Sequence, residues 1–249
     1  MCNCLLALVA LGLVPWTAVS QSDFSLHHAG LYQYDARMSF LKAGELTLNL
    51  NRAGELYEVS GQFQTSRAMS RYYSWSGLFA AKGRWESAGP ITEAYMARTM
   101  GKDDDLKIVL NTPDSARVLD SAQDEFVAIT KPAGIDLISA LFFTPSCYSG
   151  GVVHDGEDVY QLELHRQKKA RLRGGKAYFK GEVMQCHYHV RDHKNRKRQV
   201  IVSLAEINGA TVAVQVRAKI PLLPDAIFKL KMPLPEANDN GPTLAISAG

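Results

Sequence analysis

Cysteine is scarce in this chain of 249 residues, and its placement is uneven. Of the four cysteines, Cys2 and Cys4 lie at the start of an apolar run at residues 5–14, and only Cys147 and Cys186 lie beyond it. This scarcity excludes the class of small domains that a dense disulfide framework holds together. A chain of this length can bury an adequate core without one. A disulfide here would therefore add to the fold and not be its foundation.

Long hydrophobic runs are also lacking beyond residues 5–14, so no transmembrane segment is expected in the mature chain. The run itself is too short to span a bilayer but has the length of a signal-peptide core. Ala18 and Ser20 place small residues where a signal peptidase cleaves, which predicts a cleavable signal peptide at residues 1–20. The mature chain would be soluble and exported. In an oxidising compartment its two cysteines, Cys147 and Cys186, are expected to form a disulfide.

No strong excess of one charge is present. The net charge is +3 and the isoelectric point is near 8.6, which is too weakly basic to indicate nucleic acid. Two basic runs stand out, at residues 166–173 and 191–198. One interpretation makes them hairpin ends at one rim of a sheet, in peripheral contact with an anionic membrane surface. The contacting residues would be Lys168, Lys169, Arg171, Arg196, Lys197 and Arg198. We favour the alternative, solubilising loop tips.

The signatures of common enzymes are missing. Ser87 lacks the first glycine of a nucleophile elbow, and there is no phosphate-binding loop or dinucleotide fingerprint. His187 and His189 share one face of a strand, with His193 nearby, but no carboxylate completes a metal site. Residues 103–105 are acidic but lack the alternating oxygen ligands of a calcium loop. The sequence thus predicts a protein that is not an enzyme and holds no cofactor or metal.

Helical periodicity is rare, and a period of two dominates. Apolar and polar residues alternate at 46–50, 57–60 and 212–217, which is typical of strands with one buried face. Asn208 and Gly209 stand between two such segments and predict a tight hairpin.

The one helical segment is residues 136–143, where Asp136 is expected to cap the N-terminus. Its place before Cys147 predicts a short helix that the disulfide holds against the sheet. The segment from Pro233 onward is rich in Pro, Asn and Gly, which predicts a disordered tail at residues 233–249. The expected fold is one all-β domain at residues 21–232. It would be a single antiparallel, strongly curved sheet, barrel-like or spiral, with one short helix.

A cluster of aromatic residues has two interpretations. In a barrel-like sheet its members would line a cavity for an acyl chain. We favour ordinary core packing, because aromatic side chains are large contributors to the core of any β domain. The cluster consists of Phe63, Tyr73, Trp75, Phe79 and Trp85.

Several short motifs follow one another in a recognisable order: a Gly-containing element at residues 40–46, then the helix at residues 136–141, Cys147, an Asp-Gly turn at residues 155–156 and Cys186. In this order the chain resembles the DUF3108 family of exported bacterial proteins, over about residues 34–230. Leu137 departs from the family, which often has Pro there. Glu157 and Asp158 follow the Asp-Gly turn, where Arg is common in the family. The resemblance implies a periplasmic β protein and no particular activity.

We therefore expect a non-catalytic periplasmic protein that supports cell-envelope integrity through binding. The alternative is a carrier that holds a lipid or lipoprotein acyl chain on a concave apolar face of the sheet. A third interpretation, an enzyme, is the least favoured of the three, because no nucleophile, base or metal set can be assembled. The partners would be a lipid or an envelope protein, and not nucleic acid.

Overall fold

The computed structural model describes residues 30–72, 74–86, 89–101, 105–121, 125–219 and 224–234. The expected signal peptide, most of the expected tail and Tyr73 lie outside these residues. Within them, fifteen strands form one sheet. The order is β8-β7-β6-β5-β4-β3-β2-β1-β15-β14-β13-β12-β11-β10-β9, and all neighbours are antiparallel except β9 and β10.

The first half of the sheet follows the chain outward from its centre. It comprises β1 (Gly30–Met38), β2 (Leu41–Ala53), β3 (Leu56–Thr65), β4 (Ser76–Glu86), β5 (Gly89–Met100), β6 (Leu106–Asn111), β7 (Ala116–Asp120) and β8 (Val127–Ala128). The second half returns to the centre, where the last strand pairs with β1. It comprises β9 (Ile135–Asp136), β10 (Gly150–His154), β11 (Val159–Leu172), β12 (Gly181–Arg191), β13 (Lys197–Ile207), β14 (Ala210–Lys219) and β15 (Ala226–Leu230). Two helices, α1 (Arg67–Ser70) and α2 (Leu137–Phe142), complete the described elements.

The alternating patterns do form strands. Leu46, Leu48 and Leu50 are all buried on one face of β2, as predicted. In β14 the prediction of one wet face is wrong, because Ala213 and Gln215 are buried as well as the valines. The predicted hairpin between β13 and β14 is confirmed. Asn208 and Gly209 both have positive φ, at 52° and 79°, which a tight hairpin turn requires.

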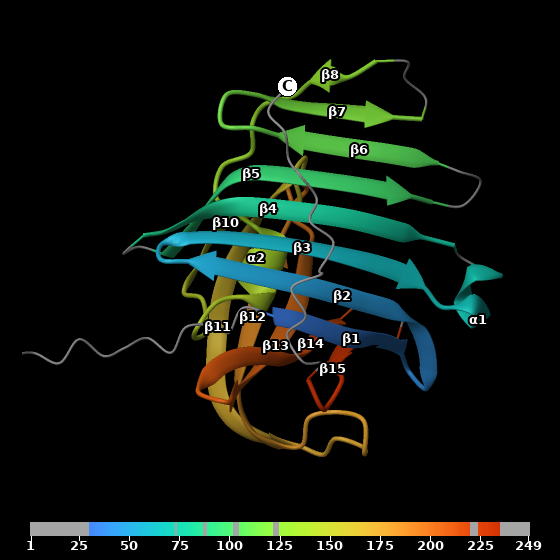
Figure 1. Cartoon of the computed structure of the whole chain (residues 1–249), viewed down its shortest axis with the longest axis vertical. Helices are drawn as coiled ribbons and strands as arrows, with labels where there is room; N and C mark the ends of the chain where they lie inside the picture. Colours follow the sequence, from blue (N-terminus) through green and yellow to red (C-terminus); the bar gives the residue numbers. More distant parts are fainter. Residues whose placement is uncertain are drawn as a thin grey trace, which may run out of the picture.

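The expected closure of the sheet into a barrel or spiral is wrong: the sheet is open and not strongly curled. Its edge strands, β8 and β9, have two residues each and are not paired with one another. In Figure 1, β2–β7 run across the view and β11–β14 cross behind them at a steep angle, with α2 between. Strand β9, at the outer edge of the second half, contacts β5 of the first half through a side-chain hydrogen bond. Thr92 Oγ1 of β5 donates to Asp136 Oδ2 of β9 at 2.9 Å. A side-chain contact replaces the backbone ladder that closure would need.

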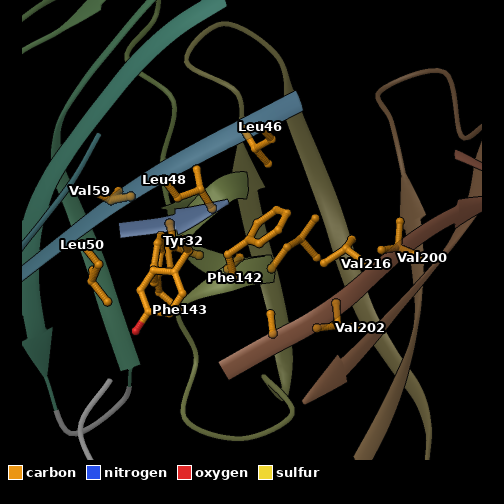
Figure 2. Close-up of a cluster of buried hydrophobic side chains, with 14 of the residues drawn as sticks. Tyr32, Leu46, Leu48, Leu50, Val59, Phe142, Phe143, Val200, Val202 and Val216 are labelled. Atoms are coloured by element: carbon orange, nitrogen blue, oxygen red, sulfur yellow. The ribbon is translucent and has the colours of Figure 1, made fainter. Parts of the chain in front are cut away.

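Helix α2 fills the space between the two halves of the sheet. Its predicted cap is confirmed, since Asp136 Oδ1 accepts the Ser139 N–H at 2.9 Å. Phe142 on this helix meets Tyr34 of β1 edge to face, with ring centroids 5.2 Å apart. Figure 2 shows Phe142 between the leucines of β2 and Val216 of β14. One apolar core therefore includes both halves of the sheet and the helix.

The expectation of a single helix is wrong, because α1 adds one turn after β3. Ser66 begins it: its Oγ accepts the Met69 N–H at 3.3 Å and donates to the Lys42 carbonyl at 2.6 Å. A four-residue turn is too short to show helical periodicity in a sequence. No helix among the described residues is long and apolar enough to cross a membrane.

The disulfide between Cys147 and Cys186 is confirmed, with the two Cα atoms 5.4 Å apart. Cys186 lies on β12 and is fully buried. Cys147 follows α2 by five residues, so the bridge joins the connection after the helix to an interior strand of the second half. This is the arrangement that the sequence predicts.

Candidate functional site: an apolar cavity beside α2

A cavity of about 580 Å³ lies between the two halves of the sheet, with α2 as one wall. Apolar side chains from β2–β6, α2 and β12–β15 form most of its lining. They are Leu46, Phe63, Trp75, Leu78, Phe79, Tyr95, Ala97, Val109, Leu137, Ile138, Leu141, Phe142, Val190, Val200, Val216, Ala218 and Phe228. The volume is within the usual range of small-ligand sites, about 300–1,000 Å³.

The helical wall is fixed at both ends. Asp136 caps the start of α2, and the Cys147–Cys186 bridge holds the segment that follows it. Between these points Leu141 and Phe142 are buried, whereas Leu137 and Ile138 are only partly buried and face the cavity. The wall is therefore preformed and does not depend on a ligand.

The opposite wall is aromatic. Phe63 and Trp75 lie with ring centroids 4.7 Å apart, and Phe63 also meets Phe228 at 6.4 Å. Phe79 packs over Gly61 of the neighbouring strand, where a Cβ atom would be 2.2 Å from the Phe79 ring. Glycine at this position therefore gives the Phe79 ring its place in the wall.

The predicted aromatic cluster divides in the structure. Phe63, Trp75 and Phe79 line the cavity. Trp85 does not, because it lies at the far end of β4, where its ring meets Tyr57 edge to face at 6.1 Å and the Arg52 guanidinium lies 5.0 Å above it. Tyr73 is outside the described residues. Lining the cavity and packing in the core are not exclusive, because Phe79 is also part of the buried core and Phe63 packs against it.

Charged residues surround the mouth of the cavity, and most are paired. Lys107 forms an ion pair with Glu157, and Arg196 Nε lies 2.6 Å from Asp192 Oδ2. Arg198 lies two residues before the buried Val200 and so points to the same face of β13. Among the described residues it has no carboxylate within ion-pair distance. Lys219, which also lines the cavity, likewise forms no ion pair within the described part of the chain, so the mouth offers two cations without a carboxylate partner there.

Tyr160 adds a polar edge to this mouth. Its hydroxyl donates to Asp155 Oδ2 at 2.7 Å. Burial, and next the hydrogen bond to the Asp155 carboxylate, raise the pKa of Tyr160, so the phenol stays neutral. Asp155 also accepts the Glu157 and Asp158 N–H groups at 3.3 and 2.9 Å, which fixes the turn after β10.

The two basic runs do not meet at one rim, contrary to the first interpretation of the sequence. Lys168, Lys169 and Arg171 lie within β11 and are exposed, whereas residues 191–198 comprise the end of β12, the turn that follows and the start of β13. Met184, the partner of Lys169, precedes Arg191 by seven residues, which is about 23 Å at about 3.3 Å per residue. Arg196 and Arg198 lie at the cavity mouth. Lys197 is exposed at the start of β13.

The histidines do not assemble into a metal site. His189 stacks on His165 with ring centroids 4.7 Å apart, and His193 Nδ1 lies 3.9 Å from an Asp158 oxygen. In the described residues no group of three or more His, Cys, Asp and Glu side chains is placed to hold a metal ion. Asp105 accepts a hydrogen bond from Ser121 at 2.5 Å, and the other members of the acidic triplet lie outside the description.

Sequence reasoning missed a buried polar network at the base of α2. Thr92 of β5 lies 3.0 Å from the Tyr57 hydroxyl, and its oxygen accepts the Asp136 N–H at 2.8 Å. Burial is the main cause that raises the pKa of Tyr57, so its hydroxyl remains protonated. These residues are 35 and 44 positions apart, and no local pattern marks them. The network orients the helical wall of the cavity.

Comparison with protein-family models, with curated proteins and with solved structures finds no match to this chain.

Proposed function

We propose that this protein binds the acyl chain of a lipid or lipoprotein in the cavity beside α2, as a non-catalytic component of the bacterial periplasm. Of the two binding roles that the sequence suggests, the carrier gains the more specific support. The observation that carries this proposal is an apolar cavity of about 580 Å³. Protein interiors pack as densely as organic crystals and leave few voids larger than a water molecule.

A groove beside α1 fits an acyl chain less well. Its volume is about 880 Å³, and its lining includes Lys42, Glu45, Arg67 and Arg71. An acyl chain placed there would desolvate charged groups without offering them partners, which is costly. The cavity beside α2 keeps its charges at the mouth.

The mouth suits an amphiphile with a polar head. A chain that fills the cavity would bring its head close to Arg198, whose guanidinium can bind a carboxylate or phosphate through two hydrogen bonds. Envelope lipids carry such groups next to their acyl chains. The proposal therefore favours an anionic head over a cationic one.

The assignment of the protein to the periplasm has separate support. The disulfide fits an oxidising environment such as the periplasm. The expected signal peptide and the resemblance to the DUF3108 family point the same way. A role in envelope integrity would follow from the handling of lipids or lipoproteins.

A cavity-filling substitution tests the proposal. Gly77 faces the cavity, and a Cβ atom there would have only ordinary contacts, 3.6 Å or more from Trp75 and Thr99. Gly77→Leu should therefore fold normally and occupy the space of the ligand. We expect it to lower the affinity for a fluorescent fatty acid at least tenfold, the loss that about 1.4 kcal/mol of binding energy produces.

The matched control is Gly175→Leu, the same change where nothing lies within 4 Å of the added atom. Gly175 lies in the β11–β12 turn and does not line the cavity. The control should bind the fatty acid as the unaltered protein does. Equal affinity in all three proteins would place the acyl chain elsewhere, and no binding by any of them would refute the proposed function.

A further inference from the structure

Two aromatic side chains are almost fully exposed at one end of the sheet. Phe40, in the turn between β1 and β2, is 79% exposed, and Tyr72, just after α1, is 81% exposed. Leu41 beside Phe40 is 46% exposed. Leu41 and Tyr72 both line the groove beside α1, and Phe40 directly precedes Leu41, so these apolar side chains form one surface. Figure 1 shows α1 and the β1–β2 turn at the same end of the sheet.

This surface is held in a fixed shape. Arg37 donates to the Phe40 carbonyl at 2.7 Å, which ties the turn to β1. Ser66 at the start of α1 donates its backbone N–H to the Ala43 carbonyl at 2.8 Å, and Tyr72 donates its own to Met69 at 2.9 Å. The exposed aromatic rings are therefore carried by backbone that is already bonded. Burying them against a partner would cost little backbone entropy.

The charge around the aromatic rings is positive. Arg67 and Arg71 are exposed, and within the described part of the chain neither forms an ion pair or a side-chain hydrogen bond. The groove lining contains one carboxylate, Glu45, which is occupied by Lys42 and by Lys231 at 3.1 Å. Arg67 and Arg71 are thus left without an acidic partner among the residues that the structure describes.

The groove beside α1 and the cavity beside α2 are adjacent at this end of the sheet. Phe63 and Gln64 are neighbours at the end of β3, and Phe63 lines the cavity while Gln64 lines the groove. Trp75, which lines the cavity, is held to Thr65 by three hydrogen bonds of 2.6, 2.9 and 3.0 Å. The exposed aromatic residues therefore lie across the edge of the sheet from the acyl-chain site.

We infer that this surface, comprising Phe40, Leu41, Arg67, Arg71 and Tyr72, docks the protein on an anionic lipid bilayer. Aromatic side chains prefer the level of the lipid headgroups, where a ring is partly buried and a hydroxyl stays hydrated. Basic side chains add attraction to anionic headgroups. The surface therefore combines aromatic side chains for the headgroup level with basic side chains for the anionic headgroups. Docking at this end would bring the cavity close to the lipids from which an acyl chain must come.

A protein partner fits the surface less well. It would have to supply a carboxylate for each arginine and a pocket for each aromatic ring, whereas a bilayer presents anionic headgroups and an apolar interior without a fixed pattern. A second copy of this chain would place like charges against one another, because a two-fold interface brings the same surface together. The bilayer is the occupant that the charges favour.

Sedimentation with vesicles tests the inference. The probe is vesicles of phosphatidylethanolamine and phosphatidylglycerol, with vesicles of phosphatidylcholine alone for comparison. Arg67→Gln with Arg71→Gln should lower binding to the anionic vesicles about 25-fold, since each basic residue near such a surface contributes about fivefold. Phe40→Ser with Tyr72→Ser should lower binding to both kinds of vesicle.

The matched control is Lys168→Gln with Lys169→Gln, which removes the same charge from the far part of β11. It should retain nearly full binding. An equal loss in the control would show attraction by overall charge and overturn the inference. So would failure of the unaltered protein to bind, or a change of oligomeric state in the Phe40 and Tyr72 variant. Fatty-acid affinity in solution, measured on the same variants, should stay unchanged, which keeps this test separate from that of the cavity.

Discussion

His154 is a single buried residue that makes the stability of the molecule depend on pH. It ends β10, is 2% exposed and lies edge to face against Tyr95, with ring centroids 5.7 Å apart. Its Nδ1 accepts the Gly156 N–H at 3.1 Å and so carries no proton in the folded state. Burial lowers the pKa of His154 below its ordinary value of 6.5, although Asp136 and Asp155 oppose the shift.

The sign of the effect on stability follows from this shift. Below pH 6.5 the unfolded chain binds a proton at this residue more readily than the folded chain does. The free energy of unfolding therefore falls as the pH falls from 6.5 towards the lower folded pKa, and is unaffected above pH 7.5. Between pH 7.5 and 5.5 this residue can account for at most about 1.4 kcal/mol.

Urea unfolding at a series of pH values measures that loss. His154→Asn keeps an acceptor for the Gly156 N–H and does not titrate, so its stability should depend less on pH over this interval. His193→Asn, in an exposed turn, should behave as the unaltered protein. If both variants keep the full pH dependence, the titrating group lies elsewhere.

At the scale of elements, α2 and its disulfide form one unit. The bridge closes a loop between positions 39 residues apart, which corresponds to about 4 kcal/mol in the chain-entropy account. Cys147→Ala with Cys186→Ala should lower the free energy of unfolding by up to that amount without preventing folding, because the core does not depend on the bridge. The measurement is urea unfolding, compared with the unaltered protein in reductant. Unchanged stability in both would show that the bridge does not form.

The elements differ in how far the sequence reveals them. Helix α2 and the turn at Asn208 were predictable because their signals are local: an N-cap with an apolar side, and two residues that tolerate positive φ. The cavity was predictable only in part. Phe63, Trp75 and Phe79 cluster in sequence, but Val190, Val216 and Phe228 reach the cavity through strand pairing over long distances. The open sheet was missed because β8 and β9 are too short to leave a pattern.

At the scale of the whole molecule, the return of the chain to its starting strand matters most. Strand β15 pairs with β1, so the two halves share a central ladder as well as the core around α2. Phe142 meets Tyr34 of β1 and Phe228 of β15, with ring centroids 5.2 and 6.3 Å apart. Neither half has a core of its own that excludes the other. The molecule is therefore expected to unfold in a single cooperative step despite its length.

Two spectroscopic signals can test this expectation, because they report on different parts of the molecule. In the mature chain that the sequence predicts, the tryptophans are Trp75 and Trp85, both in or beside β4 of the first half. Their fluorescence follows that half, whereas far-ultraviolet circular dichroism follows all strands. The two urea transitions should coincide. Phe142→Ala should lower the free energy of unfolding by about 3–5 kcal/mol and shift both transitions together, because it removes a ring that both halves contact. Separate transitions would mean that the halves fold as independent units and that the cavity between them can open without global unfolding.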